Sequence, residues 1–355
     1  MIAESYNVVG VMSGTSLDGC DLAYINLSIN DGKWQYKIFE AVTIPYTKEW
    51  LHKLRTAIDY SQRELEALNV EYTILLSEII RDFIARHRLI NIDAICSHGH
   101  TIVHRPQDGI TLQIGNLPTI ATLTGQRVVC DFRVADVILG GQGAPLVPIG
   151  DRMLFSQYNF CLNLGGFSNI SFEENGNRIA FDICPVNTVL NFYANQLGHE
   201  FDDGGKIAAA AVINDDLLKD LNSFDYYTAP YPKSLGLEFV KQTVIPLIDK
   251  YKDAAPNNLA TFTEHIAMQI SNALLNKSST GRLLITGGGA YNSLLVNRMR
   301  ELMPGLDIVV PDDKTVQYKE ALIFALLGVL KLRGEINVLA SVTGAPYDHA
   351  SGIIY

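Results

Sequence analysis

A pattern of strand, glycine-rich polar turn and strand occurs in the first third of the chain and again in the middle third. The first copy fills residues 8–44 and the second fills residues 160–182, each with strand-like apolar runs joined by tight turns. The two copies share little sequence identity. A chain that repeats this plan is expected to form an α/β protein with a duplicated β-β-β-α core, in two lobes with a central cleft.

Helical patterns follow these units. Ser61–Leu89 carries apolar residues at helical spacing, and the final third alternates helices with the strand-like runs Leu283–Thr286 and Asp307–Val310. The turn-forming stretch Gly140–Pro145 is expected to be a hinge or a binding loop. We therefore predict an N-terminal lobe of residues 1–145 and a C-terminal lobe of residues 146–355, whose last helix or tail packs back on the first lobe.

Composition narrows the classes of partner. The 355 residues include 28 Lys and Arg against 38 Asp and Glu, for a net charge of −10 without a basic cluster. Nucleic acid and anionic membranes are therefore unfavourable partners. The five cysteines are scattered without metal-type spacing, and no apolar run has the length of a membrane span. We predict a cytoplasmic protein with reduced thiols and no nucleic-acid or membrane partner.

The turn of the first copy, Gly10–Asp21, is the strongest candidate site. Its glycines let backbone N–H groups converge, and Thr15 and Ser16 add hydroxyl donors, which suits phosphate oxygens. Asp18 and Asp21 are suited to hold Mg²⁺ through water, because Mg²⁺ keeps most of its hydration shell. An ordinary hairpin turn explains the same residues about equally well, and the chain contains no P-loop motif.

Three histidines, His98, His100 and His104, follow another strand. This spacing is typical of a metal site, but no further histidine or carboxylate stands in a comparable setting, so we favour a loop that lines a polar substrate pocket. Arg133 lies between Asp131 and Asp136 and suits a sugar or a carboxylate. A surface ion pair is the competing interpretation.

Asp182 ends an apolar strand, at the place where open α/β sheets put their active sites. A partly buried carboxylate there predicts a general base. The alternative is a helix cap, for which Asn187 is the better candidate. Cys184 as a thiol nucleophile is not favoured, because the sequence shows no histidine partner for it.

Two further features stand at element ends. Gly287, Gly288 and Gly289 would let a flat adenine or ribose approach the backbone, although a tight turn also needs small residues. Lys319 and Glu320 open a very apolar helix, and we expect this charged pair to face the cleft.

Eight motifs, in order, resemble those of the anhydro-N-acetylmuramic acid kinase family. They are GVMSGTSLDGCD, SHGHTIVHRP, TLQIGN, VVCDFRVADVILGGQGAPLVP, LNLGGFSNIS, PKSLG, TGGGAYN and KEALIFALLG. The resemblance implies a two-domain fold of the sugar kinase, Hsp70 and actin type, and a homodimer. It also implies an enzyme of peptidoglycan recycling, which converts ATP, water and anhydro-N-acetylmuramic acid into ADP and N-acetylmuramic acid 6-phosphate.

The resemblance also implies roles for individual residues. Asp182 matches the catalytic base, which activates the water that attacks C1 while O6 takes the phosphoryl group. The implied cofactors are ATP and Mg²⁺, with Asp18 holding the metal through water. The expected nucleotide-binding residues are Gly14, Thr15, Ser16, Leu17, Asp18, Gly19, Cys20, Asp21, Gly165, Gly166, Gly287, Gly288 and Gly289. The expected substrate-binding residues are Ser13, His98, Arg133, Asp136, Asn169 and Glu320.

The chain departs from the family pattern in two places. Where the family usually reads FDTGPGN, residues 181–187 read FDICPVN, and Asp203-Gly204-Gly205-Lys206 stands where RDG and a small or aromatic residue are usual. A bulkier, less polar turn beside the base would allow another amino sugar or anhydrosugar as substrate. The remaining alternatives are a non-catalytic ATP-binding sensor and a metal-dependent hydrolase at the three histidines.

Overall fold

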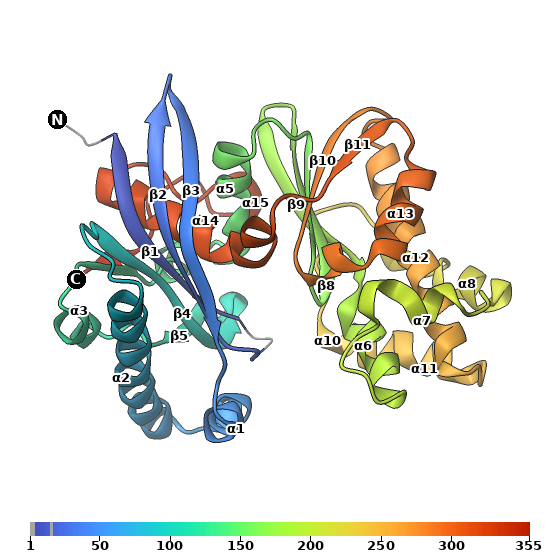
Figure 1. The fold of residues 1–355 in the computed structure, drawn as a ribbon, viewed down its shortest axis with the longest axis horizontal. Helices are drawn as coiled ribbons and strands as arrows, with labels where there is room; N and C mark the ends of the chain where they lie inside the picture. The colour runs from blue at the N-terminus through green and yellow to red at the C-terminus, as the bar shows by residue number, and fades with distance from the viewer. Residues whose placement is uncertain (1–3, 15–16) are drawn as a thin grey trace. The chain divides into compact units, whose positions relative to one another are not determined.

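The computed structural model describes residues 4–14 and 17–355, and the chain divides into two compact units (Figure 1). Unit 1 comprises Met1–Phe155 and Tyr318–Tyr355, and unit 2 comprises Ser156–Gln317. Unit 1 thus runs past residue 145, where the sequence analysis ends the first lobe, and it includes the C-terminal segment. The stretch Gly140–Pro145 lies inside unit 1 rather than between the units, so its interpretation as a hinge was wrong.

The sheet of unit 1 has the strand order β12-β6-β4-β1-β2-β3, with β5 paired to β4. β1, β2 and β3 form an antiparallel meander, and β4 and β6 extend it in parallel with β1. The strands are β1 (Ser5–Ser13), β2 (Cys20–Asn30), β3 (Lys33–Ile44), β4 (Ala94–Arg105), β5 (Ile110–Ile114), β6 (Val128–Cys130) and β12 (Ile353–Ile354).

The sheet of unit 2 repeats this plan, with the order β11-β10-β7-β8-β9. β7, β8 and β9 form the antiparallel meander, and β10 and β11 extend it in parallel with β7. The strands are β7 (Phe160–Leu164), β8 (Phe167–Glu174), β9 (Asn177–Pro185), β10 (Gly281–Thr286) and β11 (Leu306–Val309). The duplicated α/β core predicted from the two turn units is therefore confirmed.

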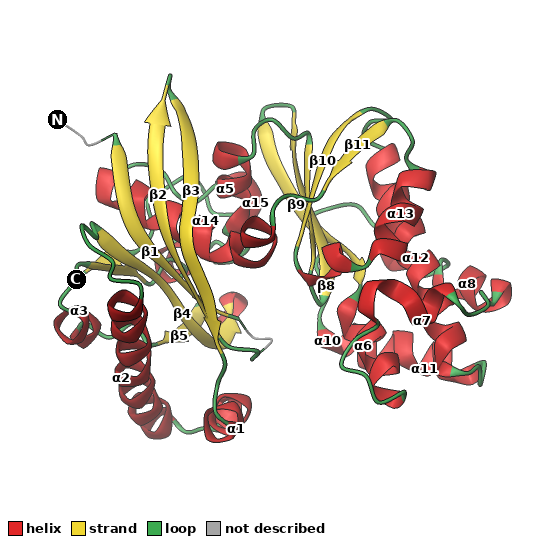
Figure 2. Cartoon of the chain, in the orientation of Figure 1, coloured by secondary structure: helices red, strands yellow, loops and turns green. Residues whose placement is uncertain are grey.

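Helices pack on both sheets (Figure 2). Those of unit 1 are α1 (Lys48–Thr56), α2 (Gln62–Arg86), α3 (Thr119–Thr124), α4 (Val134–Ile138), α5 (Val147–Leu154) and α15 (Ala340–Thr343). Those of unit 2 are α6 (Asn187–Gln196), α7 (Lys206–Ala209), α8 (Asp215–Leu221), α9 (Asp225–Thr228), α10 (Leu237–Phe239), α11 (Ile245–Lys250), α12 (Ala255–Leu275) and α13 (Ser293–Leu302). A further helix, α14 (Asp313–Arg333), contains a kink at Tyr318.

Helix α2 begins where its sequence provides a capping box. The Ser61 side chain accepts the N–H of Glu64, and the Glu64 carboxylate accepts the N–H of Ser61 at 2.8 Å. The buried apolar residues of this helix, which include Tyr72 and Leu76, belong to the same apolar cluster as Val9 and Val11 of β1. Because strand side chains alternate between faces, α2 covers the face of the sheet to which the odd-numbered residues of β1 point.

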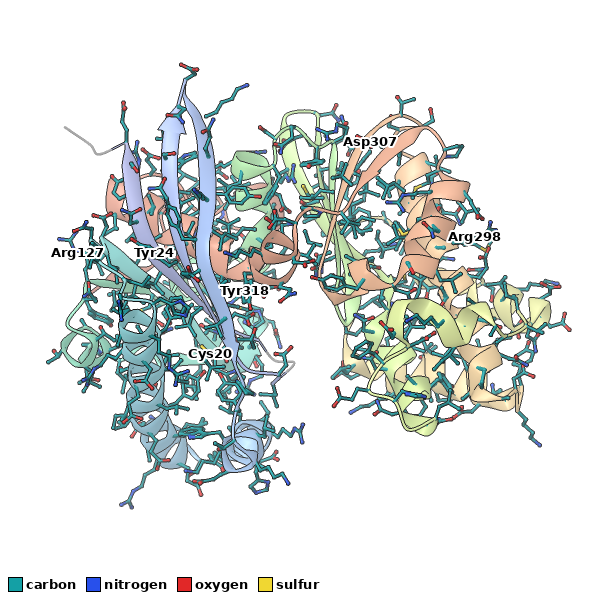
Figure 3. All side chains as sticks on the ribbon, viewed as in Figure 1. Cys20, Tyr24, Arg127, Arg298, Asp307 and Tyr318 are labelled. Atoms are coloured by element: carbon teal, nitrogen blue, oxygen red, sulfur yellow. The ribbon has the colours of Figure 1, made fainter. Side chains whose placement is uncertain are left out.

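Helix α14 packs against the opposite face of this sheet. A Cβ atom added to Gly10 of β1 would lie 2.1 Å from the carbonyl oxygen of Ala321, and one added to Gly328 would lie 2.2 Å from Cys96 Sγ. Backbone and helix therefore approach without side chains between them. Residues 321–330 are all buried, as expected for a helix that is apolar on every side. The helix begins at Asp313, before the start at Lys319 that the sequence predicted, and Tyr318 marks the kink (Figure 3).

Replacing Gly328 with alanine should destabilise unit 1 by about 1–3 kcal/mol, because the added methyl group overlaps Cys96 in a packed core. Thermal unfolding measures this loss as a lower melting temperature. The double variant Gly328→Ala, Cys96→Ala, which removes the overlapping sulfur, should recover part of the loss. A melting temperature of the single variant equal to that of the wild type would contradict the close approach.

Candidate functional site

The candidate residues of unit 1 gather at one edge of its sheet. β1 ends at Ser13 and β6 ends at Cys130, next to Asp131, and the part of β4 that pairs in parallel with β1 runs past His98 to His100, which is opposite Ser13. The carboxyl ends of parallel strands are where open α/β sheets bind ligands. The sequence expectation of a loop for the histidines was wrong: β4 continues through His104, because β5 pairs with its second half.

In the glycine turn between β1 and β2, the residues on either side of Thr15 and Ser16 are joined by a hydrogen bond. The N–H of Leu17 donates to the carbonyl of Gly14 at 3.2 Å, and Leu17 has a φ of 62°. Asp18 is exposed, whereas Cys20 is fully buried at the start of β2. Thr15 and Ser16, which the sequence analysis assigned to phosphate binding, lie outside the described residues.

Negative charge is concentrated beside this turn. Thr43 donates a hydrogen bond of 2.6 Å to Asp21, but desolvation and the neighbouring carboxylates of Asp18 and Glu320 together raise the pKa of Asp21 to about 6. Desolvation and Asp18 also raise the pKa of Glu320, against the lowering effect of Arg133 and Lys319. The Glu320 side chain nevertheless keeps exposed surface, so a ligand can reach it. The turn therefore has the electrostatics of a cation-binding edge.

Arg133 and His98 form a fixed pair at the same edge. The Nε of Arg133 donates to His98 Nε2 at 2.9 Å, so the neutral histidine carries its proton on Nδ1, which lies 2.9 Å from the carbonyl of Gly99. Burial and the charge of Arg133 hold the pKa of His98 well below its usual range. Burial lowers the pKa of Arg133 to about 10, so Arg133 stays cationic at neutral pH.

The guanidinium of Arg133 keeps donors for a ligand. Its Nη1 donates to the carbonyl of Gly143 at 2.7 Å, while its Nη2 has no acceptor among the described residues. Asp136 lies behind this pair and is completely buried. Its carboxylate accepts the N–H of Gly143 at 2.6 Å and the hydroxyl of Thr343 at 2.8 Å. Asp136 thus holds the loop that contacts Arg133.

Ser13 lies within a buried chain of hydrogen bonds that joins His100 to two tyrosines. Its hydroxyl lies 2.8 Å from His100 Nδ1 and 2.6 Å from the hydroxyl of Tyr46, which in turn lies 2.5 Å from the hydroxyl of Tyr72. Burial lowers the pKa of His100 to about 4, so this ring is neutral. Neither tyrosine is predicted from the sequence, because nothing in their local pattern distinguishes them from ordinary core residues.

Lys319 and Glu320 have different environments although they are neighbours on α14. The ammonium of Lys319 lies 2.7 Å from the carboxylate of Asp151 in α5, and both side chains are buried. The expectation that the charged pair faces a cleft was therefore wrong for Lys319. This ion pair fixes α14 to α5 just after the kink, and it is one of the contacts that join α5 to unit 1.

In unit 2 the candidate residues also share one edge. β7, β9 and β10 run in the same direction, so Gly165, Asp182 and Gly287 all lie at or near carboxyl ends. Asn169 of β8 is exposed and stands opposite Asp182 in the register of β8 and β9. Cross-strand partners point to the same face, so Asn169 and Asp182 are neighbours.

Asp182 is a half-buried carboxylate with one bonded oxygen. Its Oδ2 accepts the N–H of Leu235 at 2.9 Å, and its Oδ1 has no partner among the described residues. Desolvation raises the pKa of Asp182, while the N–H of Leu235 opposes the rise. A carboxylate with a raised pKa and an open oxygen is suited to accept a proton.

The unusual turn FDICPVN directs its apolar side chains inward. Ile183, Cys184 and Val186 are buried and belong to the apolar core of unit 2. Burial raises the pKa of the Cys184 thiol to about 12, which leaves no thiolate for nucleophilic chemistry. The predicted cap at Asn187 was wrong, because Asn187 lies inside α6 and its amide donates to the carbonyl of Leu164.

The three glycines after β10 differ in their surroundings. Cβ atoms on Gly287 and Gly289 would lie 2.6 Å and 2.7 Å from Asn163 and Leu164, whereas Gly288 would meet nothing closer than 3.8 Å. Packing therefore explains the first and third glycines, and Gly288 is the open position. Gly165 and Gly166 form the β7–β8 turn, and their carbonyls accept the N–H groups of Asn187 and Thr188. The pair Asp203 and Lys206 lies exposed on the surface.

The described residues contain no group of three or more His, Cys, Asp and Glu arranged to hold a metal. His98 Nε2, His100 Nδ1 and His104 Nδ1 instead contact Arg133, Ser13 and Thr111. Within the described ranges, no helix has the length and apolar character needed to cross a membrane.

The pKa of Asp21 predicts a pH-dependent stability. Because the folded state raises this pKa from 3.8 to about 6, ionised Asp21 destabilises the fold above pH 6, and protonation removes that penalty as the pH falls towards 4. Asp21→Asn should therefore melt at a higher temperature than the wild type at pH 7, and the difference should shrink between pH 6 and pH 4. Asp31→Asn, in the exposed β2–β3 turn, is the control. A difference independent of pH would contradict the raised pKa.

Comparisons with known proteins assign the family. The family model described as anhydro-N-acetylmuramic acid kinase matches residues 6–355. Curated relatives with that name from Clostridioides difficile and Pasteurella multocida are both 34% identical to this chain. The alignments cover 95% of this chain and 95% of the first relative, and 98% of this chain and 96% of the second.

Among solved structures, a ligand-bound xylulose kinase from Lactobacillus acidophilus matches 92% of this chain and 90% of its own, at 11% identity and a TM-score of 0.45. The sequence matches alone decide the assignment, since they extend over nearly the whole chain. The chain belongs to the anhydro-N-acetylmuramic acid kinase family.

Proposed function

We propose that this chain uses ATP and water to open the anhydro ring of anhydro-N-acetylmuramic acid and to phosphorylate its O6. The products are N-acetylmuramic acid 6-phosphate and ADP. The observation that carries this proposal is the family match, which extends from residue 6 to residue 355. The inward direction of Ile183, Cys184 and Val186 supports the family substrate, because the altered side chains join the core of unit 2.

Asp182 is the general base in this proposal. A water molecule attacks C1 of the sugar, the bond between C1 and O6 breaks, and O6 forms its new bond to the γ-phosphorus while ADP leaves. Asp182 takes the proton from the water through its open oxygen. Support comes from its half-buried carboxylate, its raised pKa and the N–H of Leu235 on the other oxygen. A pKa closer to neutrality makes a stronger base that is still ionised.

Arg133, Glu320, His98, Ser13 and Asn169 bind the sugar in this proposal. The guanidinium of Arg133 offers free donors beside an aligned, neutral His98. Such donors suit the carboxylate and hydroxyl groups of a muramic acid. Asp136 acts on the sugar indirectly, by holding the Gly143 loop against Arg133.

The glycine turns bind the phosphates of ATP, with Gly14–Asp21 in unit 1 and Gly165–Gly166 in unit 2, and Gly287–Gly289 contact the base or ribose. Support for the last group comes from the open space at Gly288. A divalent cation suits the turn of unit 1, because Asp18 and Glu320 leave Asp21 with an unneutralised negative environment. Asp18 would hold Mg²⁺ through water, and the metal would neutralise phosphate charge.

The proposal includes a cytoplasmic location and a homodimer. Dependence on ATP supports the first, and resemblance to the family supports the second. The alternative to a kinase is a sensor that only binds ATP. Such a sensor would not need a proton-accepting carboxylate, so the role of Asp182 distinguishes the kinase from the sensor.

Asp182→Asn should lower turnover by about 10²–10⁴, because the amide keeps the size of the side chain but cannot accept a proton. Coupled detection of ADP with anhydro-N-acetylmuramic acid measures this loss, and calorimetry should find nucleotide binding nearly unchanged. Cys184→Ala is the matched control, since it alters the same strand without touching the base. Turnover of Asp182→Asn within about threefold of the wild type would contradict the role of Asp182 as the general base, since that difference is worth under 1 kcal/mol.

Asp18→Asn should weaken the binding of an unreactive ATP analogue when Mg²⁺ is present, while the fold stays intact. The amide has no charge with which to hold the hydrated cation. Titration calorimetry with and without Mg²⁺ tests this, and Asp31→Asn, in the other exposed turn of the same meander, should bind as the wild type does. If Asp18→Asn and the wild type bind the analogue equally well both with and without Mg²⁺, Asp18 does not hold the metal.

A further inference from the structure

The segment Tyr226–Leu235 contacts Asp182 at three different atoms. The hydroxyl of Tyr226 donates to the Asp182 carbonyl at 2.7 Å, and the Asp182 N–H donates to the carbonyl of Lys233 at 3.2 Å. The third contact is the N–H of Leu235, which donates to Oδ2 at 2.9 Å. Both the backbone and the carboxylate of Asp182 are therefore held by one stretch of chain outside the sheet.

Tyr231 anchors this segment to the strands β8 and β9. Its ring stacks on Phe181, the residue before Asp182, with centroids 5.2 Å apart and an interplanar angle of 3°. Its hydroxyl donates to the Glu174 carboxylate and accepts a hydrogen bond of 2.9 Å from Lys277. The ammonium of Lys277 also lies 4.6 Å from the centre of the Tyr231 ring and 2.9 Å from Glu174. The anchor thus combines stacking, a charged pair and a cation–π contact.

Lys233 closes the segment on itself. Its ammonium donates to the carbonyls of Tyr226 and Tyr227 at 2.8 Å and 3.3 Å, and it lies 4.7 Å from the centre of the Tyr226 ring. The lysine charge is therefore used to hold the two ends of the segment together. This arrangement leaves Leu235 N–H directed at the carboxylate.

We propose that Tyr226–Leu235 is a positioning segment for Asp182, in which Tyr231 is the anchor and the N–H of Leu235 orients the carboxylate. The segment fixes Oδ2 by its hydrogen bond, which leaves Oδ1 as the oxygen that accepts the proton. The proposal rests on the role of Asp182 as the base. It assigns a function to the motif PKSLG, residues 232–236, and to Tyr226 and Tyr231 outside that motif.

The segment also sets where Asp182 titrates. The hydrogen bond from Leu235 lowers the pKa of Asp182 against the effect of desolvation, so loss of this bond should raise it further. The ionisable neighbours are Tyr226, Cys184 and Lys233. Burial keeps the pKa values of Tyr226 and Cys184 far above neutrality, and burial lowers the pKa of Lys233 from its usual basic value. Asp182 is therefore the group in this cluster that titrates in the acid range.

The experiment measures kcat/KM against pH for the full-length enzyme. Leu235→Pro removes the N–H donor, and it should move the acid limb of the profile upward by about one pH unit, the size expected for one hydrogen bond to a charged group. Leu235→Ala keeps the donor, so its acid limb should stay at the wild-type position. Tyr231→Ala should move the limb in the same direction by a smaller amount, whereas Tyr251→Ala, at another hydrogen-bonded tyrosine of unit 2, should not move it.

The outcomes separate the positioning segment from the base. An acid limb that stays in place in both Leu235→Pro and Tyr231→Ala, while Asp182→Asn is inactive, overturns the positioning role and leaves the base standing. If Asp182→Asn turns over substrate at the wild-type rate, Asp182 is not the general base. If circular dichroism shows Leu235→Pro to be unfolded, the comparison of Tyr231→Ala with Tyr251→Ala decides alone: an upward shift in the first only supports the segment, and equal profiles overturn it.

Discussion

The close approach of α14 to the sheet of unit 1 is the constraint on which the candidate site of that unit depends. With no side chain on Gly10, the carbonyl of Ala321 lies directly against β1, and Gly328 makes the corresponding contact with Cys96 of β4. The ion pair of Lys319 with Asp151 fixes the start of the same stretch. The helix thereby holds Glu320 where it interacts with Asp21 and Arg133. A larger side chain at Gly10 or Gly328 would shift Glu320 relative to the glycine turn.

The candidate base of unit 2 shows a second way to position a charge. Asp182 has no opposite charge among the causes that shift its pKa, and its carboxylate is balanced between desolvation and a single backbone donor. Charged side chains near it are directed elsewhere, with Lys233 bonded to two carbonyls and Lys277 to Glu174. A carboxylate paired with a lysine would be a weaker base, because the cation lowers its pKa. Because Lys233 is bonded within the positioning segment and Lys277 is paired with Glu174, neither cation is directed at Asp182.

Much of the fold follows from local pattern, and much of the site does not. The glycine turns, the alternating strands and the Ser61 capping box predict the two meanders and α2 from neighbouring residues alone. The length of β4 depends on pairing with β5, and the early start of α14 and the extent of unit 1 depend on distant packing. Tyr46, Tyr72 and Tyr231 act through partners far along the chain. The motif PKSLG was visible, but its contact with Asp182 requires the fold.

The discontinuous composition of unit 1 has a consequence for synthesis on the ribosome. Unit 2 is one continuous stretch, so all of its strands have been made once residue 317 has been added. Unit 1 lacks α14 until later, and β6 lacks its antiparallel neighbour until Ile353 and Ile354 are available. While the whole of unit 2 is translated, the face of β1 at Gly10 therefore remains uncovered, because α14 has not yet been made. Apolar surface exposed in this way is prone to aggregation, so the interval is the stage at which a nascent chain of this kind most needs a chaperone.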